Sequence, residues 1–211
     1  MDITESDDPG PAVHGATRHP DDRDRPESRD QKQKRTFRAT KIKRHSDPVR
    51  YPEWMIVRNA TGLDGPAISD LMVRAAPHFD TKCYPDQLLP PGMTVLVAME
   101  NGRVVGWLEG VLDWDYTEPG APTPPPHGYI LAVVVDPESR RRGIGRALLD
   151  LFVAEAREAD VRWVYLIPEG GEGTAGRLAF FHAAGFTELP PTDDPLPPMG
   201  RWTDVEAMAH H

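Results

Sequence analysis

The residues with the most distinctive chemistry in this chain form one short segment, in which an apolar stretch leads into a basic turn and two glycines. The segment runs Val133, Val134, Val135, Asp136, Pro137, Glu138, Ser139, Arg140, Arg141, Arg142, Gly143, Ile144, Gly145, Arg146. The first amide N–H groups of a helix lack an intrahelical partner and carry the positive end of the dipole, so they bind anions. Gly143 and Gly145 let a ligand approach the backbone, and the arginines add forked donors suited to phosphate oxygens. The segment therefore predicts a site for a phosphorylated ligand.

The spacing of this motif excludes two common phosphate binders. The chain has no Gly-x-x-x-x-Gly-Lys-Ser/Thr, and no Gly-x-Gly-x-x-Gly follows an early strand. Its pattern, Arg140-x-x-Gly143-x-Gly145, resembles the acetyl-coenzyme A pyrophosphate loop of the GNAT N-acetyltransferase superfamily, Gln/Arg-x-x-Gly-x-Gly/Ala. The alternative is a basic surface turn without a ligand.

The elements around the motif predict a mixed α/β protein. Apolar runs and turn residues predict strands at 54–58, 94–99, 104–112, 129–135, 161–167, 186–189 and 201–208. Helical spacing predicts one helix between Asp64 and Pro77, a second that begins at Ile144, a third over 177–184 and a short helical piece near 86–89. The second helix places the glycines at a helix start, as anion binding requires.

This order of elements also resembles the GNAT fold, over about residues 54–208. The family's second recognisable stretch, Tyr-x-x-x-Gly-Phe at the end of a helix, corresponds here to Phe181-x-x-x-Gly185-Phe186. The resemblance implies a central mixed, mostly antiparallel twisted sheet of six to seven strands, flanked by about four helices (class α/β, or α+β). We expect this domain to occupy residues 51–211.

What the family implies for chemistry can be placed on this sequence. Val133, Val134 and Val135 would pair with the pantetheine arm, and an amide near Val133 would polarise the thioester carbonyl. The amides of residues 141–146 would hold the pyrophosphate. An amine would attack the acetyl thioester directly, so Cys83 is not needed as a nucleophile. Phe181 stands where the family often has the tyrosine that protonates the leaving thiolate, and it cannot do so.

Three side chains are candidates for proton transfer, because an ammonium cannot attack until it loses a proton. Glu109 is expected on the strand beside the cofactor strand, and its alternative is a solvent-facing strand residue. His127 and Tyr129 open the cofactor strand, and the alternative for His127 is an ordinary loop histidine. No set of residues here predicts a metal site.

A proline-rich connection, residues 113–128, is the expected acceptor side. Its acidic and aromatic residues suit a cationic amine, and Asp113, Asp115 and Tyr116 are the expected substrate-binding residues. Five prolines make the connection stiff. Long insertions in compact domains are usually functional or unstructured, and both readings stay open at this point.

Charge is divided unevenly along the chain. Residues 1–50 hold 12 of the 24 basic and 10 of the 33 acidic residues and few large apolar side chains, which predicts a disordered tail. Residues 51–211 keep 12 basic and 23 acidic residues, a net charge of −11, with four of the basic ones at 140–146. This balance disfavours nucleic acid as a partner, although the basic segment 32–44 leaves that question open. One cysteine and no long apolar run predict a cytoplasmic protein that does not cross a membrane.

The sequence therefore predicts an N-acetyltransferase that moves acetyl from acetyl-CoA to a primary amine of a cationic small molecule. The alternatives are an acyl-CoA-binding sensor without turnover and a protein N-acetyltransferase. By analogy with the family, a homodimer is expected. The identity of the amine and the choice between acetyl and a longer acyl donor are not encoded in any motif found.

Overall fold

The computed structural model describes residues 52–78, 89 and 91–204. The chain divides into two units, residues 1–36 and 37–211, and every described residue belongs to the second. The tail predicted over 1–50, its basic segment 32–44 and Cys83 lie outside the described residues. Among the residues that are described, no helix is both long and apolar enough to span a membrane.

Seven strands, three α-helices and two short 3-10 helices make up the described part of the chain. The strands are β1 (Met55–Asn59), β2 (Thr94–Glu100), β3 (Arg103–Trp114), β4 (His127–Val135), β5 (Trp163–Leu166), β6 (Thr187–Glu188) and β7 (Met199–Trp202). The helices are η1 (Gly62–Asp64), α2 (Gly65–Ala75), η3 (Pro137–Ser139), α3 (Ile144–Glu158) and α4 (Thr174–Ala183). Between β2 and β3, Asn101 and Gly102 have φ values of 49° and 78°, the left-handed pair that the Asn-Gly signal predicts.

The strands form one sheet in the order β1-β2-β3-β4-β5-β7-β6. β4 and β5 are parallel and all other neighbours are antiparallel. This confirms the mixed, mostly antiparallel sheet of the predicted fold class. The described residues contain three α-helices rather than about four, and the predicted piece at 86–89 falls almost entirely outside them.

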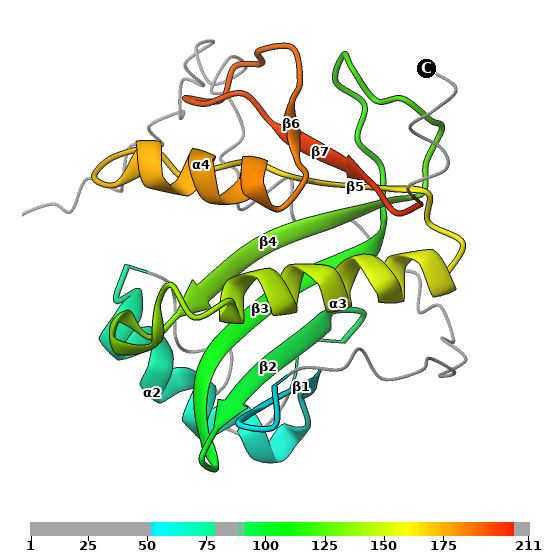
Figure 1. The fold of residues 1–211 in the computed structure, drawn as a ribbon. Coiled ribbons are helices and arrows are strands. Elements are labelled where there is room, and N and C mark those ends of the chain that lie inside the picture. Colours follow the sequence, from blue (N-terminus) through cyan, green and yellow to red (C-terminus); the bar gives the residue numbers. More distant parts are fainter. Residues whose placement is uncertain (1–51, 79–88, 90, 205–211) are drawn as a thin grey trace, which may run out of the picture. The chain divides into compact units, whose positions relative to one another are not determined.

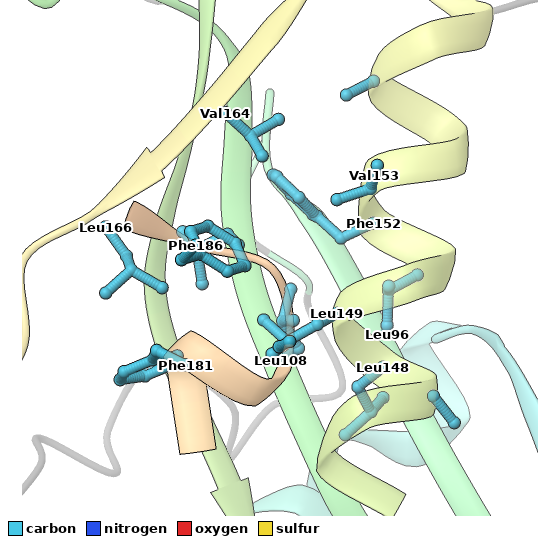
Figure 2. Close-up of a cluster of buried hydrophobic side chains, with 14 of the residues drawn as sticks. Leu96, Leu108, Leu148, Leu149, Phe152, Val153, Val164, Leu166, Phe181 and Phe186 are labelled. Carbon is cyan, nitrogen blue, oxygen red and sulfur yellow. The ribbon is translucent and has the colours of Figure 1, made fainter. Parts of the chain in front are cut away.

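Each face of the sheet carries its own apolar core, because side chains alternate along a strand. Leu96 and Leu108 belong to the core shared with α3 and α4, whereas Val95, Val97 and Trp107 belong to the core shared with α2. Figure 1 shows α3 lying along the strands β2 to β4. The core on the α3 face is drawn in Figure 2, where side chains of α3 meet those of β2, β3 and β5.

Two glycines of β3 bring α3 close to the sheet. A Cβ at Gly106 would lie 2.7 Å from Cγ2 of Ile144, and one at Gly110 would lie 2.6 Å from Cε2 of Phe152. Both distances are shorter than a normal carbon–carbon contact, so a side chain at either position would push the helix away. These glycines thereby allow the close approach of α3 to β3, Gly106 at the helix start and Gly110 near its middle.

A third apolar cluster lies at the β4–β5–β7 end of the sheet. Tyr116, Trp163 and Tyr165 are its buried members, and Trp114, Ala121, Tyr129, Leu189 and Trp202 pack against them. Val164 and Leu166 of β5 face the α3 core, so the alternating Trp163 and Tyr165 face away from α3. The proline-rich loop after β3 therefore packs on the face opposite α3.

The last strand differs from its prediction. β7 covers Met199–Trp202, whereas the sequence predicted a strand over 201–208. The sequence pattern missed the start of the strand because Gly200 is a poor strand former, yet a glycine is needed there, since a Cβ would lie 2.3 Å from Cζ2 of Trp163. Thr203 and Asp204 are outside the strand, and residues 205–208 are not described.

Candidate active site

The helix start predicted to bind phosphate is present at the end of β4. Gly143 precedes α3 in the left-handed conformation, with φ of 82°, and no side chain caps the helix. A Cβ at Gly143 would meet nothing within 4 Å, so its backbone faces open space. Arg141 is also left-handed, with φ of 61°, which costs energy for a residue with a side chain. The first N–H groups of α3 are therefore open to an anion.

Asp136 anchors the turn that leads to this helix start. Its buried carboxylate accepts hydrogen bonds from Nη2 of Arg103 at 2.8 Å, from Nη2 of Arg74 at 3.3 Å and from the N–H of Glu138 at 3.1 Å. Its own N–H donates to the carbonyl of Val105 at 2.9 Å. One carboxylate thus joins α2, β3, β4 and η3.

The arginines of the motif have divided functions. Arg142 is held by Glu100, with Nη1 to Oε2 at 2.8 Å, and stacks on Trp54 with the guanidinium 4.5 Å from the ring centroid. Arg146 donates to Asp150 at 2.8 Å and to the carbonyl of Ala183. These two therefore brace the fold.

The first two arginines are the ones left for a ligand. Arg140 makes one long contact, 3.4 Å from Nε to the Val135 carbonyl. The Arg141 guanidinium has no hydrogen bond or ion pair within the described part of the chain. The predicted phosphate contacts of the side chains thus fall to Arg140 and Arg141.

β4 and β5 pair over only three residues and then separate. Gly128, Tyr129 and Ile130 pair with 164–166, where β5 ends, while β4 continues to Val135. Among the described residues, no strand pairs with this edge of β4 beyond Ile130. Figure 1 shows β4 running away from β5 and β7. An extended ligand arm can hydrogen-bond to such an unpaired edge.

A β-bulge marks the point where the two strands part. Glu109 pairs with Ala132 and Gly110 with Ile130, so Leu131 is the extra residue of β4. Because of it, Ile130 packs in the α3 core, whereas Ala132 and Val134 pack in the α2 core. Val133 and Val135 then face the α3 side. The part of β4 beyond Ile130, where β5 no longer pairs with it, is called the opening in the sheet, and it begins at the bulge.

The sequence profile of the acetyltransferase (GNAT) family matches residues 66–186, more than half of the chain. This stretch contains nearly all of α2, the bulged β4, the turn predicted to bind phosphate and α4. The chain belongs to the GNAT acetyltransferase family. It is therefore an acyltransferase. No curated protein sequence gives a significant match.

Solved structures share this GNAT fold at low identity. The ribosomal-protein-S18-alanine N-acetyltransferase from Escherichia coli has 20% identity and a TM-score of 0.54, over 72% of this chain and 95% of that one. An aminoglycoside N-acetyltransferase in complex with CoA has 16% identity and a TM-score of 0.57, over 70% and 97%. The PaiA N-acetyltransferase from Thermoplasma acidophilum in complex with coenzyme A has 14% identity and a TM-score of 0.53, over 70% of this chain and 98% of that one. At these identities the likeness concerns the fold.

Glu109 has the best position of the three residues predicted for proton transfer in this GNAT domain. Its pairing with Ala132 places it beside the opening, one strand away. Trp107 and Leu108 face α2 and α3 respectively, so Glu109 faces the α2 side. The residue is half-buried. Its catalytic role stays a prediction.

His127 has both ring nitrogens engaged by backbone. The ring is fully buried; Nδ1 accepts from the Tyr116 N–H at 3.1 Å, and Nε2 lies 2.8 Å from the Thr123 carbonyl. This pattern requires the neutral form, with the proton on Nε2. The ring also lies edge-on to Trp163, with centroids 5.1 Å apart. The arrangement suits a residue that holds the 115–126 loop, and it leaves neither nitrogen for proton transfer.

The acidic and aromatic residues predicted to bind the acceptor differ in how deeply they are buried. Tyr116 is buried and its hydroxyl has no hydrogen-bond partner among the described residues. Burial raises the pKa of Tyr116, and the carboxylates of Glu118 and Asp194 add to the rise. Asp113 is half-buried at the end of β3, whereas Asp115 is exposed in the loop.

Phe181 confirms that the usual tyrosine hydroxyl is missing here. The ring is buried in the α3 core, 6.1 Å between centroids from Phe186 and edge-on to it (Figure 2). Within the described residues there is no group of three or more His, Cys, Asp or Glu side chains that could hold a metal ion.

Three features of the site were not predicted from the sequence. The bulge at Leu131 depends on pairing with β3, and nothing in an apolar run signals it. Arg177 donates to the carbonyls of Glu169, Gly170 and Glu172 at 3.0, 3.2 and 3.0 Å and so shapes the loop before α4. Tyr165 was expected in a strand, but its stacking on Tyr129 follows only from the parallel pairing of β4 with β5.

Proposed function

We propose that this protein transfers the acetyl group of acetyl-CoA to a primary amine of a cationic small molecule, by direct attack in a ternary complex. The observation that carries the proposal is the continuity between the open helix start at Gly143 and the unpaired edge of β4 that leads to the bulge. The helix start suits the pyrophosphate of acetyl-CoA, and the edge of β4 suits the amide groups of its pantetheine arm. The arm would end where the sheet opens.

In this proposal the reaction has one bond-forming and one bond-breaking step. The amine nitrogen attacks the thioester carbonyl carbon, and the negative charge that develops on the oxygen is stabilised by a backbone N–H of the bulge segment 131–133. The carbon–sulfur bond then breaks, CoA leaves as a thiolate, and the attacking nitrogen releases its remaining extra proton to water to give the neutral amide. Because a thiol has a pKa near 8.5, the thiolate is a good leaving group and takes its proton from water, so Phe181 is no obstacle.

Glu109 is the proposed general base. The carboxylate would accept the proton of the ammonium directly or through one water before attack, since only the neutral amine is a nucleophile. The net charge of −11 on residues 51–211 also favours a cationic acceptor over an anionic one.

The test is thiol release from acetyl-CoA with and without a panel of primary amines. Release that depends on an amine is expected, and Glu109→Gln should lower kcat by about 10² to 10⁴-fold while the CoA dissociation constant stays within about 2-fold. Wild-type kcat in the Glu109→Gln variant would remove this residue from the mechanism.

A second candidate function is favoured by Phe181, which lacks the proton donor. A domain that binds acyl-CoA without turnover would serve as a sensor. Tight CoA binding by calorimetry, with no thiol release from any amine in the panel, would favour the sensor over the transferase.

A further inference from the structure

A wall of aromatic side chains stands beside the opening in the sheet, on the face away from α3. Tyr129 of β4 stacks on Tyr165 of β5, with centroids 4.7 Å apart and ring planes at 13°. Trp114 of β3 lies 5.6 Å from Tyr129 at 40°. Tyr165 is only 3% exposed, whereas Tyr129 and Trp114 are half-buried and form the accessible surface.

Strand register fixes how near this wall lies to the proposed reaction. Tyr129 pairs with Val111, and the adjacent pair on the same face is Glu109 with Ala132. Neighbouring same-face pairs in a sheet are about 7 Å apart. An amine that reaches the opening beside Glu109 therefore places its next atoms against the Tyr129 and Trp114 rings.

Polar groups lie next to Tyr165, the buried part of the wall. The Tyr116 ring is 4.6 Å from Tyr165, and its buried hydroxyl has no partner among the described residues. The pKa of Tyr165 is raised, first by burial, then by Tyr129 and Tyr116, and also by the carboxylates of Asp115 and Asp194. The hydroxyls and these two carboxylates therefore share one region. A buried hydroxyl without a partner is costly unless a ligand or water meets it.

The wall is more than ordinary core. Trp163 and Tyr165 are buried, edge-packed and stacked as core residues are. Trp114 and Tyr129 extend that stack to the surface next to a reaction centre. Aromatic faces attract both flat apolar groups and cations.

We propose that the acceptor is a primary amine attached to a flat apolar body, which packs on Tyr129 and Trp114 while the ammonium faces Glu109. This inference rests on the proposed transferase function and adds the class of the acceptor. A polyamine can place a second ammonium over these partly exposed rings, but that attraction is weak where water solvates the cation. A flat apolar body also buries apolar surface against the rings, so polyamines and aminosugars should be poorer acceptors.

The experiment compares three amines of different shape in the thiol-release assay with the full chain: 2-phenylethylamine, 1,4-diaminobutane and glucosamine. We expect kcat/KM for 2-phenylethylamine to exceed that for the other two by about 10-fold or more. Equal or higher kcat/KM for either competitor would overturn the inference.

Matched variants assign the preference to the wall. Tyr129→Leu and Trp114→Leu should each lower kcat/KM for 2-phenylethylamine by about 10-fold, mainly through KM. Tyr129→Phe and Trp114→Phe keep an aromatic face and should retain most of the preference. A thermal melt of each variant identifies any loss due to unfolding. A folded Tyr129→Leu protein with an unchanged preference would contradict the proposal.

Binding without turnover separates the two proposals. One outcome is that no amine raises thiol release, but calorimetry shows that 2-phenylethylamine binds and that Tyr129→Leu weakens this binding about 10-fold. That outcome would contradict the transferase proposal and support amine binding at the aromatic wall. If all three amines react equally, the transferase proposal is supported and the proposal that the aromatic wall selects the acceptor is wrong.

Discussion

Replacing Asp136 by asparagine tests whether one carboxylate holds the turn that is predicted to bind phosphate in place. The Asp136 side chain is 4% exposed and pairs with Arg103 and Arg74, whose side chains are 54% and 40% exposed. Removing one partner of a buried ion pair costs about 3–5 kcal/mol, but these arginines can be hydrated, so we expect a loss of about 2 kcal/mol in the free energy of unfolding. Asparagine still accepts from the Glu138 N–H, so η3 should form.

The assay is urea denaturation together with calorimetric titration of CoA. Because the turn loses its links to α2 and β3, the CoA dissociation constant should rise about 10-fold. Asp150→Asn is the matched control: Asp150 also bridges two arginines, Arg146 and Arg201, at 2.8 Å each, but it is 31% exposed. This control should cost under about 1 kcal/mol and leave CoA affinity unchanged. An Asp136→Asn protein with wild-type stability and affinity would refute the reasoning.

Three further predictions concern the surroundings of the site. Arg58, hydrogen-bonded to Asp64, holds the pKa of that carboxyl at about 2. This pair should stabilise the fold by roughly 1–2 kcal/mol above pH 4 and lose that contribution between about pH 4 and pH 2, so the stability gap between wild type and Asp64→Asn, followed by urea denaturation against pH, should close over that range. Tyr116→Phe removes an unpartnered hydroxyl and should leave the free energy of unfolding unchanged or raise it by up to about 1 kcal/mol; a loss above about 1 kcal/mol would show that the hydroxyl is paired. His127→Ala removes two buried hydrogen bonds and a ring, so it should cost about 3 kcal/mol and raise KM for the amine more than it changes CoA affinity; full stability with lost kcat would instead favour a base.

The fold was largely predictable because its signals are local. The Asn101-Gly102 turn, the apolar runs of β2 and β3 and the glycines before α3 each specify their own backbone. The start of α3 after Gly143 was predictable for the same reason, since a helix start and its glycines are adjacent in the sequence, and its binding of a cofactor stays a prediction.

The acceptor side was less predictable because its geometry depends on pairing between distant strands. Leu131 becomes a bulge only through the register with β3, and Tyr129 meets Tyr165 only through the parallel pairing. His127 was a candidate base by its position, yet backbone groups on both sides of the loop occupy its nitrogens. Long-range hydrogen bonds of this kind leave no trace in a residue pattern.

Titration of acetyl-CoA into a Gly143→Asp protein tests the central claim, that the start of α3 binds the pyrophosphate. The control is Gly102→Asp, because Gly102 also has a left-handed φ, 78° against 82°, with nothing within 4 Å of its Cβ, and lies in the β2–β3 turn. Both variants carry the same charge and similar backbone strain, about 1–2 kcal/mol. We expect Gly143→Asp to weaken acetyl-CoA binding at least about 100-fold and the affinity of Gly102→Asp to stay within about 3-fold of wild type. Equal affinities of the two variants would contradict the central claim.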